Sequence, residues 1–158
     1  MWISYNGVEF TPPSTCGARD ASIIVYATTT LGLPLEYSID DKRTWHSSNT
    51  FNNLPSGDYH IWVRDIISIC LEDAGVFNIP GPVAPTILTQ GSVNPDCGME
   101  NGSITVTARV DTGDPAEFSL DGSTWQATGV FTDLGAGSYT VYVRNTGNGC
   151  EKLLDLSI

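Results

Sequence analysis

The chain contains the stretch LPSGDYHIWVR at residues 54–64 and, 80 residues later, the stretch LGAGSYTVYVR at residues 134–144. In each, a leucine and a glycine-containing turn precede a tyrosine that opens an alternating apolar and polar run. Alternation with a period of two is typical of a half-buried β-strand. A strand-opening tyrosine after such a turn predicts a tyrosine corner, in which the phenol bonds back to the backbone at a Greek-key crossover. The residues assigned to the two corners are Leu54, Gly57, Tyr59, Leu134, Gly137 and Tyr139.

The similarity between these stretches extends over most of the chain. Residues 16–41 match residues 97–122 without a gap, and after one extra residue near Lys42 the match continues through Cys70 and Cys150. A long internal repeat defines the folding unit. We expect one repeat over residues 1–80, with residues 1–7 as an extra segment, a proline-rich linker over residues 80–85, and a second repeat over residues 86–158.

Strand patterns dominate both repeats, and no stretch shows a helical period. In the first repeat, alternation predicts strands over residues 22–28, 35–39 and 59–64. Further strands are expected over residues 8–11 and 72–79 and around Trp45 and Phe51, with counterparts in the second repeat. Short strands separated by turn residues predict an all-β fold of two tandem Ig-like or fibronectin-like Greek-key sandwiches.

Four cysteines occupy equivalent positions in the two repeats. Four cysteines allow three pairings, and the duplication favours one disulfide within each repeat, Cys16–Cys70 and Cys97–Cys150. The alternative is two pairs of buried thiols. Disulfides indicate an oxidising, extracellular setting and would stabilise domains too small to bury a large core.

The net charge of −11 is spread over both repeats. An acidic surface repels the phosphates of nucleic acid and anionic membranes, which excludes both as expected partners. No targeting segment and no membrane span is recognisable in the sequence. We expect the chain to be a piece of a longer protein, with neighbouring repeats of the same polypeptide as its first partners.

The order of motifs resembles the SprB-type repeat of giant cell-surface proteins of gliding and surface-colonising Bacteroidetes. The matching residues are Cys-Gly and Asn-Gly-Ser-Ile within 97–104, the turn at 118–122, the run at 134–143 and the late Cys150. In the first repeat, Asp20-Ala21-Ser22 replaces Asn-Gly-Ser, and Asp41 replaces the glycine of the turn. The resemblance implies an Ig-like sandwich, display on the cell surface and a role in adhesion or gliding motility.

Two outward-facing features occur in both repeats. Charges of opposite sign on neighbouring strands predict cross-strand ion pairs, with two solvated charges as the alternative. Aromatic side chains beside them would stack on a glycan or a surface ligand, or would only stiffen the sheet face. The ion pairs are Glu36 with Arg64 and Glu117 with Arg144, and the aromatic residues are Trp62 and Tyr142.

Acidic loops and isolated histidines complete the candidates. The stretches 38–45 and 119–125 look like an Asp-box hairpin, in which an aspartate caps a turn. We expect no cofactor. The alternative is calcium, with Asp40, Asp41 and Asp121 as ligands, although such residues more often cap turns. His46 and His60 have no histidine counterparts in the second repeat, so we expect no enzyme and no catalytic residues.

These patterns favour a structural function. We expect a spacer repeat pair of a large extracellular adhesin or filament on the cell surface. One alternative is a glycan- or calcium-dependent binding module. Another is a self-assembling fibre subunit that donates residues 2–5 as a strand to a neighbouring chain.

Overall fold

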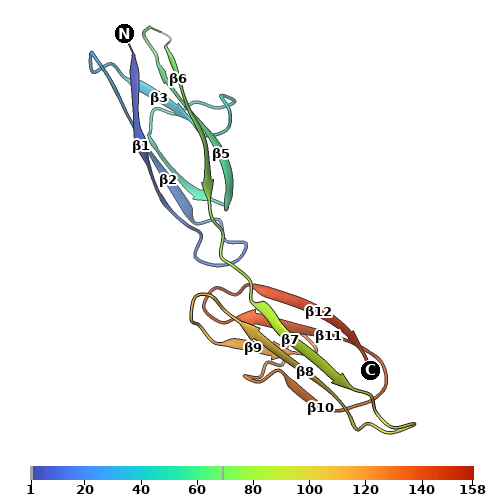
Figure 1. The fold of residues 1–158 in the computed structure, drawn as a ribbon. Coiled ribbons are helices and arrows are strands. Elements are labelled where there is room, and N and C mark those ends of the chain that lie inside the picture. The colour runs from blue at the N-terminus through green and yellow to red at the C-terminus, as the bar shows by residue number, and fades with distance from the viewer. Residues whose placement is uncertain (1, 69) are drawn as a thin grey trace. The chain divides into compact units, whose positions relative to one another are not determined.

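The computed structural model describes residues 2–68 and 70–158, and all regular structure in this part of the chain is β-strand (Figure 1). The chain divides into two compact units, Met1–Pro82 and Val83–Ile158. No helix in the described residues is long and apolar enough to cross a membrane.

Unit 1 consists of two three-stranded antiparallel sheets. The strand orders are β1-β2-β4 and β3-β5-β6, so the chain alternates between sheets after β2, β3 and β4. This order is that of an Ig-like Greek key. The strands are β1 (Ile3–Thr11), β2 (Ala21–Thr29), β3 (Leu35–Ser38), β4 (Thr50–Leu54), β5 (Gly57–Asp65) and β6 (Leu71–Ile79).

Unit 2 repeats this topology, with sheets β7-β8-β10 and β9-β11-β12. The predicted Greek-key sandwich is therefore confirmed in its strand order. The strands are β7 (Thr86–Val93), β8 (Gly102–Arg109), β9 (Ala116–Ser119), β10 (Val130–Leu134), β11 (Ser138–Asn145) and β12 (Glu151–Ser157).

Each core lies between the two sheets of its unit and is made by the alternating apolar positions. In β2, Ile23 and Val25 are fully buried, and in β5 Ile61 and Val63 face them from the other sheet. Burying such side chains is the main favourable term in folding, at about 1.5–3 kcal/mol each. The equivalent buried residues of unit 2 are Ile104, Val106, Val141 and Val143.

One expected strand does not form. Trp45 lies outside every strand, and the stretch after β3 forms two isolated bridges, Tyr37 with His46 and Asp40 with His60. The backbone of Asp41 and Lys42 has φ values of 59° and 67°, which is the left-handed region. Two consecutive residues in this conformation turn the chain away from an extended path after β3.

The first residues of the chain are not an extra segment. Ile3, Ser4 and Tyr5 belong to β1, and Ser4 pairs with Thr28 of β2. Unit 2 has the equivalent pair, Thr86 with Arg109. The expectation that this segment lacks a counterpart is therefore wrong, because bulges in β1 and β7 obscure the alignment.

The cysteines of unit 1 lie at its opposite ends. Cys16 is in the loop after β1, at the end where Ala21 pairs with Leu54, whereas Cys70 is in the turn after β5. The nine residues of β5 separate these ends, which corresponds to about 25 Å at 3.3 Å per residue. Figure 1 shows the start of β6 at the end of the unit where β1 begins, and the β1–β2 loop at the other end.

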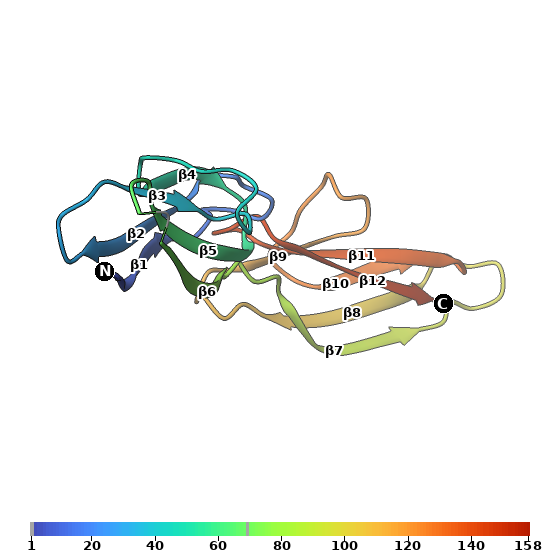
Figure 2. The ribbon, with the colours of Figure 1, turned by 90° about the horizontal axis from the view of Figure 1, so that it is seen from above.

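Unit 2 separates its cysteines in the same way. Cys97 follows β7, and Cys150 precedes β12 at the far end of β11. In Figure 2 the β7–β8 loop lies at the end of unit 2 that carries the C-terminus.

The predicted disulfides within each repeat are therefore wrong. A disulfide requires Cα atoms within about 7 Å, far less than the length of a sandwich. The disulfide-bonded cysteines are Cys16 and Cys150, and Cys97 is a free, exposed thiol.

Candidate functional site

The two tyrosine corners fix the starts of β5 and β11. The Tyr59 hydroxyl donates a hydrogen bond to Pro55 O at 2.7 Å, and the Tyr139 hydroxyl donates one to Gly135 O at 2.9 Å. Each phenol thereby ties its strand to the turn that crosses from the other sheet. The corner sets the register of the strand that carries the candidate surface residues.

The outer faces of the sheets β3-β5-β6 and β9-β11-β12 hold the candidate site. In unit 1, Glu36 pairs with Arg64 across neighbouring strands, and Arg64 Nε donates to Glu36 Oε2 at 2.7 Å. The guanidinium carbon of Arg64 lies 4.3 Å from the centre of the Trp45 ring. Arg64 is thus held by an ion pair and by a cation–π contact together.

Unit 2 contains the same arrangement. Arg144 Nη2 donates to Glu117 Oε2 at 2.6 Å, and its guanidinium carbon lies 4.0 Å from the centre of the Trp125 ring. The ion pair follows from strand alternation, but the stacking does not. Trp125 comes from the loop after β9, and only its matching position in the two repeats could have indicated a shared role.

Trp62, on β5, is partly covered by the loop after β3. Its Nε1 donates to Asp41 Oδ1 at 3.1 Å, and Lys42 Nζ lies 3.8 Å from the ring centre. In unit 2 the ring of the equivalent aromatic, Tyr142, lies near Gly122, where an added Cβ would be 3.6 Å from the ring. Both aromatics are half-buried, and their surroundings differ between the repeats.

His60 lies between two carboxylates on the same face. Its Nδ1 is 3.1 Å from Asp41 Oδ1, and its Nε2 is 2.9 Å from Asp73 Oδ1. A hydrogen bond from the Gly75 backbone and one from His60 lower the pKa of Asp73. The histidine thus connects the loop after β3 to β6.

Asp40 caps the turn after β3. Its Oδ1 accepts hydrogen bonds from the Thr44 backbone at 2.9 Å and from the Ser38 hydroxyl at 2.8 Å. Burial opposes the charged form, but the hydrogen bonds from Thr44 and Ser38 outweigh it and lower the pKa of Asp40 to about 2. The carboxylate acts as the hydrogen-bond centre of the turn.

Asp121 makes the equivalent cap in unit 2. Its Oδ1 accepts hydrogen bonds from the backbone N–H groups of Thr124 at 2.6 Å and Ser123 at 2.7 Å, which lower its pKa. Across residues 2–68 and 70–158, no three His, Cys, Asp or Glu side chains gather in an arrangement suited to a metal ion. Asp40 and Asp121 cap equivalent turns of the two units, and calcium binding by Asp40, Asp41 or Asp121 stays a prediction.

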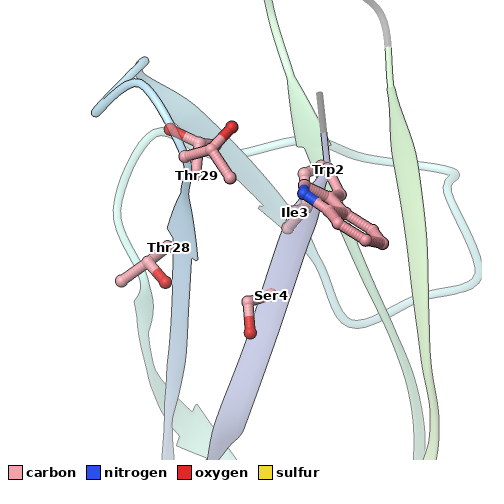
Figure 3. A pocket seen from close by; sticks show the side chains of 6 residues that line it. Trp2, Ile3, Ser4, Thr28 and Thr29 are labelled. Atoms are coloured by element: carbon pink, nitrogen blue, oxygen red, sulfur yellow. The ribbon is translucent and has the colours of Figure 1, made fainter.

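A shallow pocket of about 330 Å³ lies where β1 begins (Figure 3). Trp2, Ile3 and Ser4 line one side, and Thr28 and Thr29 of β2 lie opposite. Trp2 is 76% exposed, so its ring covers little of the unit. Among the described residues, the side chains that line the pocket offer hydroxyl groups and one indole as polar groups, and none of them is titratable.

Comparison with known proteins adds little to this description. No protein-family model matches the chain, and no curated protein matches it. Among solved structures, extracellular domains 3–5 of Drosophila OTK are similar at 14% identity and a TM-score of 0.36. The match covers 95% of this chain and 60% of that one. A TM-score at this level assigns neither fold nor function, so the fold rests on the strand order above.

Proposed function

We propose that this chain is a pair of structural repeats that extends and spaces a larger extracellular surface protein of the adhesin or filament type. The observation that carries the proposal is the Glu–Arg–Trp stack repeated on both units. Arg64 and Arg144 each stack on a tryptophan ring and form an ion pair with a glutamate of their own unit. Each arginine is therefore already bound to a carboxylate and a ring of its own unit, which supports a structural role for this sheet face.

The remaining aromatic positions support the same function. A glycan-binding site would present an aromatic ring to the sugar, with polar groups beside it free to bind hydroxyls. The Trp62 ring instead contacts Lys42, and its N–H is bonded to Asp41. Because Tyr142 has different neighbours, the two repeats do not share one ligand-binding geometry.

Binding of a glycan or of calcium is the competing function. The test is a glycan array probed with the oxidised chain, first with calcium and then with chelator. Trp62→Ala and Tyr142→Ala serve as site variants, and Trp2→Ala, at the exposed end of β1, is the matched control. No specific binding in either buffer is the expected result. Binding that Trp62→Ala or Tyr142→Ala abolishes and Trp2→Ala preserves would replace the spacer function with recognition.

A further inference from the structure

The first cysteine of each repeat stands at the outer corner of a tight turn. Ala18 N donates to Thr15 O at 3.1 Å, so Cys16 and Gly17 are the central residues of the turn. Gly17, the third residue of this β-turn, has a φ of +76°. Some β-turns require a positive φ at the third position, and glycine adopts it without strain. The Cys-Gly pair thus places the cysteine at an exposed corner of the turn.

Unit 2 builds the same corner around Cys97. Met99 N donates to Asp96 O at 2.9 Å, and Gly98 has a φ of +75°. The base of this loop is closed by a hydrogen bond from Asp96 N to Asn101 Oδ1 at 2.8 Å. Cys97 is therefore presented by a defined turn and is not a random surface thiol.

The matching loop of unit 1 is closed by Ser14 N donating to Asp20 Oδ1 at 3.0 Å. The acceptors Asp20 and Asn101 are at equivalent positions, although the donor in unit 1 is one position earlier than in unit 2. The geometry that presents Cys16 is thus reproduced at Cys97.

The second cysteine of unit 2 lies in the turn between β11 and β12. Asn145 N donates to Cys150 O at 2.9 Å, and Cys150 N donates to Asn148 Oδ1 at 2.9 Å. Asn148 Nδ2 in turn donates to Val83 O at 3.1 Å. Cys150 is therefore held at the leading end of its unit, beside the residue where that unit begins.

Cys16, by contrast, is held at the trailing end of unit 1, where its Sγ lies 3.9 Å from Pro82 O. Pro82 and Val83 are consecutive residues, so their Cα atoms are about 3.8 Å apart. Within unit 1, Cys16 thus lies beside the last residue, and within unit 2, Cys150 is hydrogen-bonded to Asn148, which holds the first residue. Both are disulfide-bonded, and each is out of reach of the other cysteine of its own unit.

We propose that the repeat is built to form disulfides between successive copies. Cys97 forms a disulfide with the cysteine equivalent to Cys150, at the leading end of a following copy of the repeat. Cys97 occupies the position of Cys16, is exposed and is a free thiol. Ile158 also marks this end as the trailing one, because its Cδ1 is 3.0 Å from a Cβ built on Gly102, the residue that begins β8. A copy that follows Ile158 would therefore begin beside the Cys97 loop.

The bond forms by thiol–disulfide exchange with a low-molecular-weight disulfide such as oxidised glutathione. The Cys97 thiolate attacks one sulfur, gives a mixed disulfide and releases one glutathione thiolate. The thiolate of the partner cysteine then attacks the Cys97 sulfur and releases the second. Two protein thiols are oxidised, two glutathione molecules are produced, and the two protons pass to solvent or to the released thiolates.

The test is a three-copy chain in which residues 80–158 are repeated once after Ile158, with Glu151→Asp in the added copy as a mass tag. The protein is refolded with reduced and oxidised glutathione, alkylated and mapped by mass spectrometry without reduction. We expect one linked peptide that joins Cys16 to the first Cys150 and another that joins Cys97 to the tagged one. In the original chain, Cys97 should be alkylated.

Two controls show whether the partner cysteine of Cys97 lies in the same chain or in another chain. Cys97→Ser should leave the tagged Cys150 peptide alkylated and the Cys16 link intact. A non-reducing gel distinguishes a bond within one chain, which leaves a monomer, from a bond between chains, which gives a ladder that Cys97→Ser abolishes. A ladder would identify the partner copy as another molecule. Alkylated Cys97 in the three-copy chain, or Cys97 linked to the Cys150 of its own repeat, would overturn the proposal.

This inference rests on the proposed spacer function, in which copies follow one another, but its test is independent of that function. Disulfide mapping reads the pairing whether or not the chain binds a glycan. Glycan binding with junction disulfides would overturn only the spacer function, whereas a blank array with unpaired Cys97 would overturn only the disulfide proposal.

Discussion

The guanidinium carbon of Arg144 lies 4.0 Å from the centre of the Trp125 ring, while its Nη2 donates to Glu117. The same three residue types meet at the same places in unit 1, where Arg64 stacks on Trp45. Because the arginine comes from a strand and the tryptophan from a loop, the contact holds the loop after β9 against the sheet. The stack therefore contributes to stability as well as to surface chemistry.

Arg144→Met should destabilise unit 2 by about 1 kcal/mol, since it removes a cation–π contact of about 0.5–1 kcal/mol and an exposed ion pair of about 0.2–1 kcal/mol. The measurement is a urea titration followed by NMR at the buried amide of Val143, which reports unit 2 alone. Arg109→Met is the control, because the Arg109–Asp111 pair is largely exposed. Equal losses in the two variants would show that the stack adds nothing beyond surface charge.

Sequence alone was sufficient for most of the strands, the Greek key and the ion pairs, because each follows from alternation along a strand. The stacking of Trp45 and Trp125 was not predictable, since loop residues have no period that fixes their direction. The cysteine pairing was predicted wrongly for a different reason. Duplication shows that Cys16 and Cys97 are equivalent, but the end of the sandwich that each cysteine occupies is set by the topology.

Tyr139→Phe should cost unit 2 about 1 kcal/mol, because it removes the hydrogen bond to Gly135 O and leaves that carbonyl without its phenol partner. The ring itself stays in place, so the near-native NMR spectrum should be retained. Tyr142→Phe, on the outer face of the same strand, is the control and should change stability by only a few tenths of a kcal/mol. If both variants behave alike, the corner hydrogen bond is not a stabilising element.

Gly129→Ala should destabilise unit 2 by more than about 2 kcal/mol or prevent it from folding. A Cβ at this buried position would lie 2.0 Å from Val106 O and 2.9 Å from Phe118 Cδ1, and the first of these atoms is backbone that cannot move aside. Gly135→Ala is the matched control, because the nearest atom to its Cβ would be Glu100 Cγ at 3.7 Å. Thermal melts of the two variants test the prediction, which fails if Gly129→Ala melts with the parent chain.

The Asp40 cap should make unit 1 sensitive to acid. Hydrogen bonds lower the pKa of this carboxyl from 3.8 to about 2, so the folded unit binds the proton less readily than the unfolded chain does. The stabilisation is therefore complete above about pH 4 and is lost as the pH falls towards 2. Asp40→Asn should lower the melting temperature of unit 1 at pH 7.

At pH 2 the difference between Asp40→Asn and the parent chain should become small, because the parent carboxyl is then half protonated. Melts followed by NMR at the buried amides of Ile61 and Ile23 separate unit 1 from unit 2. Asp121→Asn, made in the same way in unit 2, should leave these unit 1 amides unchanged at every pH. A stability difference for Asp40→Asn that persists unchanged from pH 7 to pH 2 would mean that the charge of the carboxylate is not what holds the turn.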